Sequence, residues 1–389
     1  MRIVHAILSL DPAFGGSPMV VSRLASAQAS LGHDVGVIAY SAESARERTS
    51  SALNTVPGWD KVTLHDVGPL KGVEGVLAPR VAQRIRSMRD LDIVHLHGAW
   101  SSSTLAGARA ARRLGVAYVV CAHGMLDPWC LAQSALKKKI ALGVAYRRVF
   151  NRAAFMHVLN RDERDLMAPL GLRMPTEIIP NGVFLEEFAS LPPAGTFRAS
   201  RPELGDAPYV LFLSRLHHKK GLDYLADAFA IVADSNERAH LVVAGPNGGA
   251  RADFERRVEP IRERVHVVGP LYGEDKLAAL ADAACFCLPS RQEGFSIAVT
   301  EALACGLPAV VSEACHFPEV AESGAGEVVA LEGAAIGAAL IRVLSDADLR
   351  TSMGAAGKAL VRERFNWPAI ARRSIERYEA HAVRQGNAP

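Results

Sequence analysis

The chain has 389 residues, of which 49% are hydrophobic and 22% are charged, and its formal net charge is +3. This composition is typical of a globular protein and excludes a disordered or collagen-like chain. No apolar run reaches the roughly 18–20 residues that a membrane-spanning helix needs, so no such helix is expected. At roughly 100–200 residues per domain, the length predicts two domains or three.

The first half of the chain alternates short β-branched runs with Ala- and Leu-rich segments of helical spacing. The expected strands are 2–8, 34–39, 92–96, 117–122, 155–159 and 177–179. The expected helices are 20–31, 104–114 and 136–151. This alternation predicts βαβ units around a parallel sheet. The first run is short and ends at Asp11-Pro12, which favours a buried strand over a signal peptide.

The same pattern starts again after a linker-like stretch at 191–195. Further strands are expected at 209–213, 240–244, 265–268, 285–288 and 309–312, and helices at 222–233, 275–284 and 297–304. We therefore predict an α/β protein of two doubly wound, Rossmann-like parallel-sheet domains that face a central cleft. The N-terminal domain spans 1–190 and the C-terminal domain 191–367. In such folds ligands bind at the carboxyl ends of the strands.

Cysteine usage and charge bear on location and partners. The six cysteines form no C-x-x-C pair, and four lie in apolar runs, which favours buried free thiols in a reducing cytoplasm over disulfides.

Residues 1–180 carry 22 Lys and Arg against 14 Asp and Glu, so the first half is basic although the whole chain is nearly neutral. A basic half predicts an anionic partner or surface.

The strongest local pattern lies at 289–306, where a strand ends, a loop follows and a helix begins at Ser296, an N-cap residue type. The amides of Gly294, Phe295 and Ser296 are expected to bind an anion at this helix N-terminus. Glu293 and Glu301 would repel a phosphate but accept hydrogen bonds from sugar hydroxyls. A ligand with hydroxyls on both sides of a phosphate satisfies both expectations, and the alternative is a pair of solvated glutamates.

Glu293 and Glu301 form an E-x7-E motif that resembles the motif of the family-4 retaining glycosyltransferases. The segments IPNGV at 179–183, SRLHHKKGLD at 214–223, GPLY at 269–272 and FNW at 365–367 are also similar to this family. The resemblance implies the GT-B fold, with the acceptor bound by the N-terminal domain and a nucleotide diphosphate sugar bound by the C-terminal domain. It also implies that a last helix, at 368–389, returns to pack on the first domain.

Two basic residues, Arg215 and Lys220, follow the expected strand at 209–213 and should reach the mouth of the cleft. Their charges would neutralise the charge that develops on a departing nucleotide diphosphate. The alternative is a basic surface turn, because the segment at 217–220 is entirely His and Lys.

The loop after the first strand contains Gly15 and Gly16, which allow the backbone to approach a ligand closely. Ser17 is expected to cap the following helix, with Pro18 at its first position. In the resembled family this loop lies against the donor phosphates, whereas the glycine pair by itself is equally consistent with a turn. The chain has no G-x-G-x-x-G fingerprint, which argues against a nicotinamide dehydrogenase, and no P-loop or G-x-S-x-G elbow.

His123 ends the expected strand at 117–122 and begins the segment HGMLDPW. In the resembled family the matching histidine lies near the reacting sugar, and this segment resembles a subgroup that builds bacterial surface polysaccharides. Asp127 is then a candidate acceptor contact. The alternatives are a structural histidine and a rigid turn at Pro128.

His95 and His97 lie on one face of a strand and have the spacing of a metal pair. No third ligand stands out, and the sequence contains no H-E-x-x-H motif. We therefore expect no metal and no cofactor, the nucleotide sugar (a UDP- or GDP-sugar) being a substrate.

A basic segment lies on the expected helix at 136–151 and contains Lys137, Lys138, Lys139, Arg147 and Arg148. We interpret it as a surface that docks on an anionic membrane, where each basic residue contributes about 1 kcal/mol. The alternative is a solvated helix face. Nucleic acid is a poorer explanation, because no aromatic platform accompanies the charge.

The combined prediction is a cytoplasmic, metal-independent, retaining hexosyltransferase of polysaccharide biosynthesis that is peripheral on the inner face of the membrane. It would move a mannosyl or glucosyl group from a nucleotide sugar to a lipid-linked saccharide acceptor. Two alternatives remain at this point: an epimerase or phosphorylase on the same fold, and a non-catalytic protein that binds sugar nucleotides.

Overall fold

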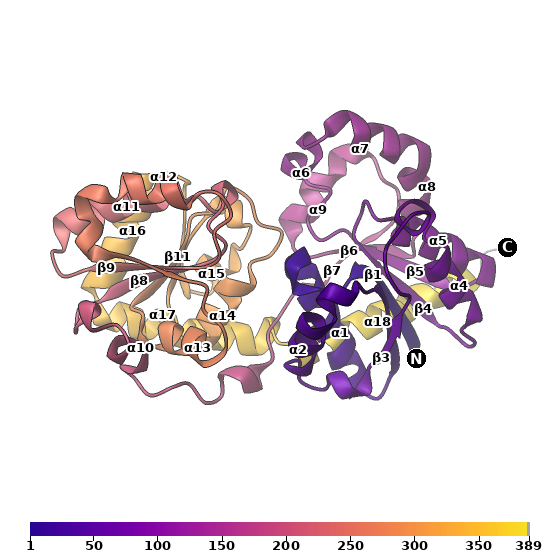
Figure 1. The fold of residues 1–389 in the computed structure, drawn as a ribbon, viewed down its shortest axis with the longest axis horizontal. Coiled ribbons are helices and arrows are strands. Elements are labelled where there is room, and N and C mark those ends of the chain that lie inside the picture. The colour runs from indigo at the N-terminus through magenta and orange to yellow at the C-terminus, as the bar shows by residue number, and fades with distance from the viewer. Residues whose placement is uncertain (387–389) are drawn as a thin grey trace. The chain divides into compact units, whose positions relative to one another are not determined.

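The computed structural model describes residues 1–386, which divide into two α/β units (Figure 1). Unit 1 comprises Met1–Asn181 and the last helix, which begins at Trp367, and unit 2 comprises Gly182–Asn366. The first boundary lies earlier than the expected 190/191. The reason is that the backbone N–H of Val183 donates to the carbonyl of Phe365 at 2.9 Å and ties this segment to unit 2.

Unit 1 is built on a seven-stranded parallel sheet in the order β3-β2-β1-β4-β5-β6-β7. Its strands are β1 (Arg2–Ser9), β2 (Asp34–Tyr40), β3 (Thr63–Asp66), β4 (Ile93–His97), β5 (Ala117–Cys121), β6 (Phe155–Val158) and β7 (Thr176–Ile178). The strand order reverses between β1 and β4. The loops that follow these two strands form the unit 1 switch point, where a doubly wound sheet binds its ligand.

The helices of unit 1 cover both faces of this sheet. They are α1 (Gly16–Ser30), α2 (Arg46–Asn54), α3 (Glu74–Leu77), α4 (Pro79–Ser87), α5 (Ser102–Leu114), α6 (Pro128–Ala132), α7 (Ala135–Ala141), α8 (Arg147–Phe150), α9 (Arg161–Met167) and α18 (Trp367–Gly386). α1 packs on α18, and α5 packs on α4. The inner strands β2, β1, β4, β5 and β6 are buried on both sides over most of their length, which explains their apolar runs.

Unit 2 repeats the architecture with a six-stranded parallel sheet in the order β10-β9-β8-β11-β12-β13. Its strands are β8 (Tyr209–Leu213), β9 (His240–Ala244), β10 (Val265–Gly269), β11 (Cys285–Leu288), β12 (Ala309–Ser312) and β13 (Gly326–Val329). The order reverses between β8 and β11, so the loops after these strands form the unit 2 switch point. The prediction of two doubly wound parallel-sheet domains is confirmed.

The helices of unit 2 pack in pairs on its sheet. They are α10 (Thr196–Ala199), α11 (Leu222–Ser235), α12 (Arg251–Arg257), α13 (Gly273–Asp282), α14 (Ile297–Cys305), α15 (Glu319–Glu322), α16 (Gly333–Ser345) and α17 (Ala347–Arg364). α11 packs on α16, and α14 packs on α17. Gly357 allows the second pair to come close, since a Cβ there would lie 3.1 Å from the side chain of Leu303.

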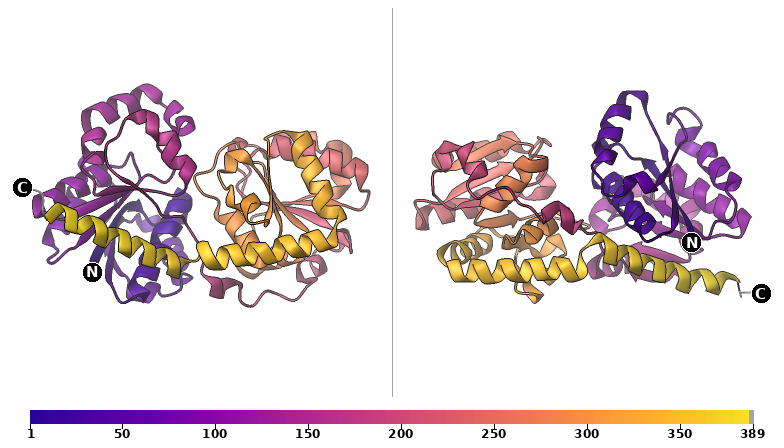
Figure 2. Two further views of the ribbon diagram at one scale, coloured as in Figure 1. Left: turned by 180° about the vertical axis from the view of Figure 1, so that it is seen from behind. Right: turned by 90° about the horizontal axis from the view of Figure 1, so that it is seen from below.

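The last helix, α18, runs along unit 1 (Figure 2). Its buried residue Tyr378 lies at the centre of this contact and is fully enclosed. The return of the last helix to the first domain is therefore as predicted, although the final three residues of the expected range fall outside the described residues. Within residues 1–386, we find no helix whose length and apolar character would let it cross a membrane.

Two local predictions are wrong, and the edge strands β3 and β13 were not predicted. The expected helix at 136–151 is divided into α7, a π-helical turn over Leu142–Tyr146, and α8. The edge strand β3 was not predicted, because its sequence TLHD is polar and its side chains are largely exposed. Ser17 does not cap α1, since the helix begins at Gly16 with Gly15 as its N-cap residue.

Candidate active site

The loops of the unit 2 switch point are held together by a close backbone approach. Lys220 lies on the loop after β8, and the loop after β11 begins at Pro289. Gly221 has φ +67°, and a Cβ at this position would lie 1.8 Å from the carbonyl oxygen of Pro289. Only glycine fits at this contact, and it brings the end of one loop against the start of the other.

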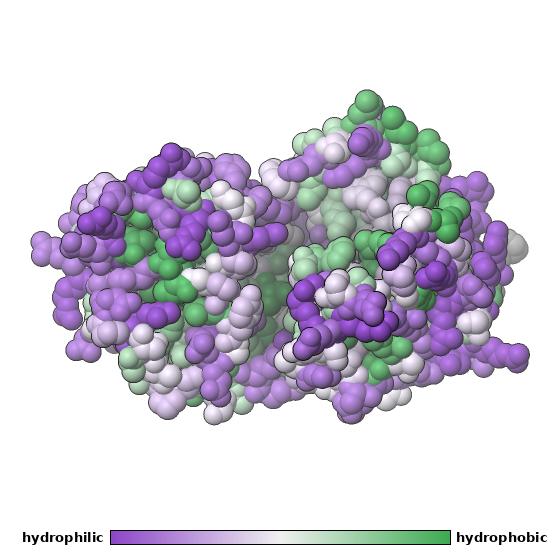
Figure 3. Space-filling model, viewed as in Figure 1, coloured by the Kyte–Doolittle hydropathy of each residue, from purple (hydrophilic) through white to green (hydrophobic). Residues whose placement is uncertain are grey.

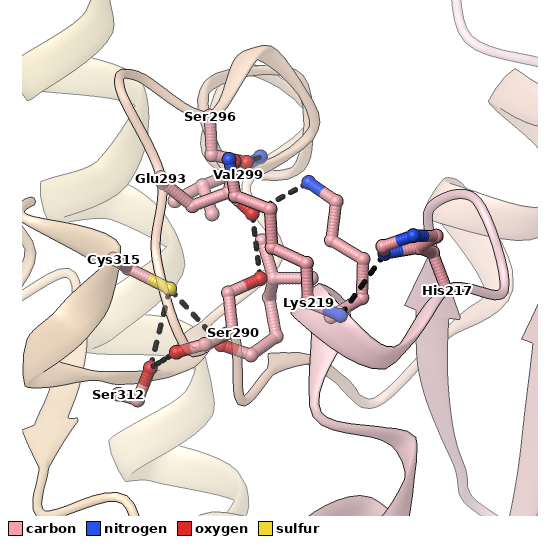
Figure 4. Close-up of polar contacts among 10 residues, drawn as sticks. His217, Lys219, Ser290, Glu293, Ser296, Val299, Ser312 and Cys315 are labelled. Carbon is pink, nitrogen blue, oxygen red and sulfur yellow. Dashed lines mark hydrogen bonds and ion pairs between the residues drawn. The ribbon is translucent and has the colours of Figure 1, made fainter. Parts of the chain in front are cut away.

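Lys220 and Glu293 meet where these loops touch. The ammonium of Lys220 lies 2.5 Å from Oε1 of Glu293, and the hydroxyl of Ser290 donates to the same oxygen at 2.5 Å (Figure 4). The two charged side chains are only 16% and 8% exposed. Below them Ser312 donates to the carbonyl of Ser290 at 2.6 Å, which fixes the loop. The predicted cation and the predicted carboxylate are therefore one buried ion pair.

The helix N-terminus beside this pair has the predicted cap. Ser296 precedes α14, and its hydroxyl accepts from the backbone N–H of Val299 at 3.4 Å. Gly294 and Phe295 lead into the cap, and the ring of Phe295 packs on that of Phe317 with centroids 5.2 Å apart. The aromatic contact anchors the loop, and the amides that precede α14 lie at the positive end of its dipole.

Glu301, the second carboxylate of the motif, lies within α14 and is paired with a residue that the sequence analysis missed. Oε1 of Glu301 accepts from Nζ of Lys276 on α13 at 2.8 Å, and the side chains are 14% and 25% exposed. No motif marks Lys276, because it reaches Glu301 from a separate strand–helix unit.

Arg215 lies exposed at the end of β8. In the part of the chain that the structure describes, its guanidinium makes no hydrogen bond or ion pair, and its stem passes close to Gly248, where a Cβ would lie 2.9 Å from Cγ. The guanidinium of Arg215 is thus positioned at the switch point only by the packing of its aliphatic chain against Gly248.

A second residue that the sequence analysis missed, Arg291, supports the basic loop. Its guanidinium binds both carboxylate oxygens of Asp223, at 2.7 and 2.5 Å, and lowers the pKa of that carboxyl. Its backbone N–H donates to the carbonyl of Lys219 at 2.8 Å. These bonds hold the segment that carries Lys220 in place.

The unit 1 switch point contains a cavity of about 200 Å³. Its lining includes Phe14, Ser17, His97, Trp100 and Met125. These residues come from the carboxyl end of β4 and from the segments that follow β1, β4 and β5, as the topology requires.

The predicted glycine pair lies at the edge of this region. Gly15 and Gly16 are exposed, and Gly15 has φ +97°, which an L-residue rarely adopts. A Cβ at either position would meet no atom within 4 Å. The positive φ angle explains why glycine occurs at position 15. The space around the Cα atoms of Gly15 and Gly16 is open, so a ligand could approach the backbone there.

His123 follows β5 with φ +52°, a strained conformation for a residue with a side chain. Its Nε2 lies 3.0 Å from Nδ1 of His97, and its Nδ1 lies 3.6 Å from Sγ of Cys121. Burial lowers the pKa of His123 to about 3, so its imidazole is neutral. His123 is thus joined by one hydrogen bond to a residue that lines the cavity.

Asp127, the predicted acceptor contact, lies at the start of α6. The residue is only 3% exposed, and its carboxylate accepts from the backbone N–H of Cys130 at 2.7 Å as the N-cap of α6. This geometry fits the alternative of a rigid turn at Pro128, and the acceptor contact stays a prediction.

Glu163 positions the backbone beside His123 and was also missed. Its two oxygens accept from the backbone N–H groups of Gly124 and Leu159, both at 2.6 Å. Burial raises the pKa of Glu163 to about 7. The signal for it was present in the sequence, because an Asn followed three residues later by Glu is typical of a helix N-terminus, and Asn160 is the N-cap residue of α9.

His95 and His97 belong to a larger cluster that also contains His5, His123 and His157. Two groups of three residues have ligand atoms close enough to hold a metal ion: His5 with His95 and His97, and His97 with Cys121 and His123. All ten ring nitrogens of the five histidines, however, have a hydrogen-bond partner. The cluster is built as a hydrogen-bond network, and its lone pairs already have donors.

The basic segment carries exposed apolar side chains as well as charge. Leu136, Ile140 and Val144 are 71%, 57% and 82% exposed. Hydrophobic residues gather at the outer end of unit 1, over α7 (Figure 3). Two of the five basic residues are tied to the protein, since Lys138 donates to the carbonyl of Cys130 at 2.5 Å and Arg147 to that of Leu170 at 2.9 Å.

The remaining basic residues of the segment are free to face a surface: Lys137, Lys139 and Arg148 are exposed.

Two known families match the chain. The family described as "Glycosyl transferase 4-like domain" matches residues 15–182, and "Glycosyl transferases group 1" matches residues 195–360. A GDP-mannose-dependent alpha-(1-6)-phosphatidylinositol monomannoside mannosyltransferase of Mycolicibacterium smegmatis is 30% identical over 306 residues, which are 74% of this chain and 77% of the relative. A monoacylated-phosphatidylinositol-monomannoside mannosyltransferase of Corynebacterium glutamicum, also GDP-mannose-dependent, is 27% identical over 76% of this chain and 78% of its own.

Solved structures share the fold of both units. Anabaena HepE in complex with UDP has a TM-score of 0.78 at 19% identity, over 98% of this chain and 100% of that one. Sucrose-phosphate synthase from Thermosynechococcus elongatus has a TM-score of 0.77 at 21% identity, over 98% and 99% of the two chains.

Proposed function

Because the chain belongs to the family-4 glycosyltransferases of the GT-B fold, we propose that it moves a mannosyl group from GDP-mannose to a hydroxyl of a lipid-linked saccharide, with retention of configuration. Hexosyl transfer from a nucleotide sugar follows from the family. The choice of mannose, of guanine and of a lipid-linked acceptor is supported by the two mannosyltransferases described above, which are GDP-mannose-dependent enzymes acting on phosphatidylinositol monomannosides.

The observation that carries the proposal is the buried pair of Lys220 and Glu293 beside the N-terminus of α14. A diphosphate needs cations and N–H donors, which Lys220, Arg215 and the amides of Gly294, Phe295 and Ser296 supply. A sugar needs carboxylate acceptors, which Glu293 and Glu301 supply. Glu293 would then lie between the sugar and the diphosphate of the donor, because its carboxylate contacts the ammonium of Lys220 directly.

In the proposed reaction the acceptor oxygen bonds to the anomeric carbon while the bond from that carbon to the β-phosphate oxygen breaks. The departing phosphate oxygen takes the acceptor's proton, so the products are the new glycoside and GDP. Lys220 and Arg215 stabilise the charge on the leaving group, and His123 contacts the reacting sugar. The loop with Gly15 and Gly16 approaches the donor phosphates. No metal or other cofactor enters this scheme.

The proposal is tested by initial rates with GDP-mannose, GDP-glucose, UDP-glucose and ADP-glucose in EDTA, using a polyprenyl-diphosphate saccharide and a phosphatidylinositol mannoside as acceptors. We expect glycoside formation with GDP-mannose alone, and thermal stabilisation by GDP but not by UDP or ADP. At 100 times its dissociation constant a ligand adds about 2.7 kcal/mol to the free energy of unfolding. Transfer from UDP-glucose only would overturn the assignment of donor. Release of GDP without any glycoside would indicate the epimerase or phosphorylase alternative, which the family matches do not favour.

We also propose that α7 and α8 dock on an anionic membrane, where a lipid-linked acceptor resides. The support is the combination of exposed Leu136, Ile140 and Val144 with exposed Lys137, Lys139 and Arg148. Apolar side chains that face water on a short amphipathic segment, interleaved with cations, are typical of interfacial binding.

Cosedimentation with vesicles of phosphatidylcholine, with and without phosphatidylglycerol, tests the docking surface. We expect binding to the anionic vesicles only, and loss of binding in the variant Lys137→Ala/Lys139→Ala/Ile140→Ser. The control is Arg112→Ala/Arg113→Ala, which removes exposed charge from α5 of the same unit. Equal loss in both variants would show a general charge effect and contradict the docking surface.

A further inference from the structure

Five imidazoles lie together in the sheet of unit 1. The strand register explains the cluster, because His5 on β1 is paired with His95 on β4, and His97 on β4 is paired with Cys121 on β5. His157 on β6 is in turn paired with Cys121. These four strand histidines are at most 2% exposed, and His123 follows β5. A buried polar network of this size is costly unless every member has a partner in the right protonation state.

The orientation of one side-chain amide sets the direction of the network. The hydroxyl of Ser374 on α18 donates to the carbonyl of Ala371 at 2.7 Å, so toward Gln28 it can only accept. The Nε2 group of Gln28 donates to Ser374 at 2.8 Å and to the hydroxyl of Tyr378 at 3.2 Å. The amide oxygen of Gln28 therefore faces His5, 2.7 Å from its Nε2.

From Gln28 the protons along the first arm follow one by one. An amide oxygen only accepts, so His5 carries its proton on Nε2 and its Nδ1 is an acceptor. Nε2 of His97 lies 2.9 Å from that Nδ1 and must be the donor. Nδ1 of His97 is then an acceptor, and Nε2 of His123, 3.0 Å away, must carry a proton. Burial keeps these rings neutral, with the pKa of His5 lowered to about 4.

The hydrogen bonds of His157 and His95, which form the second arm of the network, can be assigned from the carbonyl of Ile179, and they run in the same donor-to-acceptor direction. Nε2 of His157 lies 2.6 Å from the carbonyl oxygen of Ile179, which only accepts, so Nε2 is protonated and Nδ1 is not. His95 therefore donates to His157 across 3.3 Å and accepts at its own Nδ1 from the hydroxyl of Tyr378 at 2.7 Å. Seven hydrogen bonds run in one direction from His123 through Gln28 and Tyr378 to Ile179.

We infer that Gln28, clamped by the last helix, is a positioning residue that fixes the tautomer of His123 through His5 and His97. The ring of His123 then has its proton on Nε2 and a lone pair on Nδ1. Within the described residues that lone pair meets only the thiol of Cys121, a weak donor at 3.6 Å. A hydroxyl of the substrate is a stronger donor and would replace the thiol. His123 is thereby an acceptor for a substrate hydroxyl; this last step rests on the proposed function.

The tautomer is measured by long-range ¹H–¹⁵N correlation spectra of the full chain labelled at histidine, at pH 7.5. In the wild-type protein we expect a single Nε2–H form of His123. In Gln28→Leu, which keeps the volume and removes the acceptor, we expect both tautomers of His123. We expect kcat to fall by about 10–100-fold, the range typical of lost supporting hydrogen bonds, with the donor KM unchanged.

The matched control is Tyr378→Phe, which cuts the network on the other side of Gln28. It removes the bond to His95 and leaves the arm through His5 and His97 intact, so the tautomer of His123 should stay single. An Nδ1–H form in the wild-type protein would overturn the inference even if Gln28→Leu did not fold. The inference would also be overturned if the tautomer of His123 were unchanged in Gln28→Leu, or if that tautomer changed while kcat stayed at the wild-type value. Absence of transfer by the wild-type enzyme would instead count against the proposed function.

Discussion

The two switch points share a topology but use polar groups in opposite ways. At the unit 2 switch point the polar groups are charged and paired, as Lys220 with Glu293. At the unit 1 switch point they are neutral imidazoles, as His97 with His123. In unit 2 the charges lie on loops beyond strands that are wholly apolar, whereas in unit 1 four of the five histidines lie on the strands themselves and His123 follows β5. A strand interior excludes water, so it admits polar groups only in a neutral, fully bonded form.

This difference predicts that acid will unfold unit 1 before unit 2. Burial lowers the pKa of His5 and His157 to about 4 and of His123 to about 3, from 6.5 in the unfolded chain. The unfolded state therefore binds more protons below pH 6.5, and stability present above that pH is lost as the pH falls toward 4. Each such histidine removes about 1.4 kcal/mol from the free energy of unfolding per pH unit.

All four tryptophans lie in unit 1, so their fluorescence reports on it selectively. Urea unfolding should show the fluorescence midpoint falling steeply between pH 6.5 and 4.5, ahead of the total change in circular dichroism. His157→Gln should reduce the slope by about one proton. Coincident transitions with no pH dependence would contradict the neutral state of the cluster.

The charged switch point should respond most to loss of its cation. Lys220→Ala removes the group that stabilises the departing diphosphate and should lower kcat by about 10²–10³-fold, the typical effect of losing one preorganised charge contact. The control is Lys219→Ala, the neighbouring lysine, which should retain near-normal turnover. Near-normal turnover of Lys220→Ala in a folded protein would refute its role.

The smallest expected effect is that of removing a helix N-cap, and it tests whether the cap at Ser296 also takes part in ligand binding. Ser296 caps α14 at the unit 2 switch point and Ser101 caps α5 at the unit 1 switch point, each through its hydroxyl. Replacing either by alanine should cost about 1 kcal/mol of stability. Only Ser296→Ala should also weaken the thermal stabilisation by GDP. Equal responses to GDP in the two variants would show that the start of α14 takes no part in donor binding.

Several site residues were predictable because their signals are local. The cap at Ser296, the carboxylate Glu293 and the cation Lys220 lie where a strand pattern ends and a helix pattern begins, and Glu301 follows within the same helix. The N-cap Asn160 with Glu163 three residues later was equally visible. The segment of Asp127 has the residue types of both a ligand contact and a helix cap, and the structure shows the cap.

The sequence by itself determined the alternation of strands and helices, the two doubly wound units and the loops that carry the site, because periodicity and caps depend on neighbours in the chain. Only the tertiary structure decided which side chains pair. Lys220 meets Glu293 across 73 positions, Lys276 meets Glu301 across 25, and Gln28 meets Tyr378 across 350. Hydrogen bonds depend on distances of about 3 Å, and these are set by the register of strands and the return of the last helix, which no local pattern encodes.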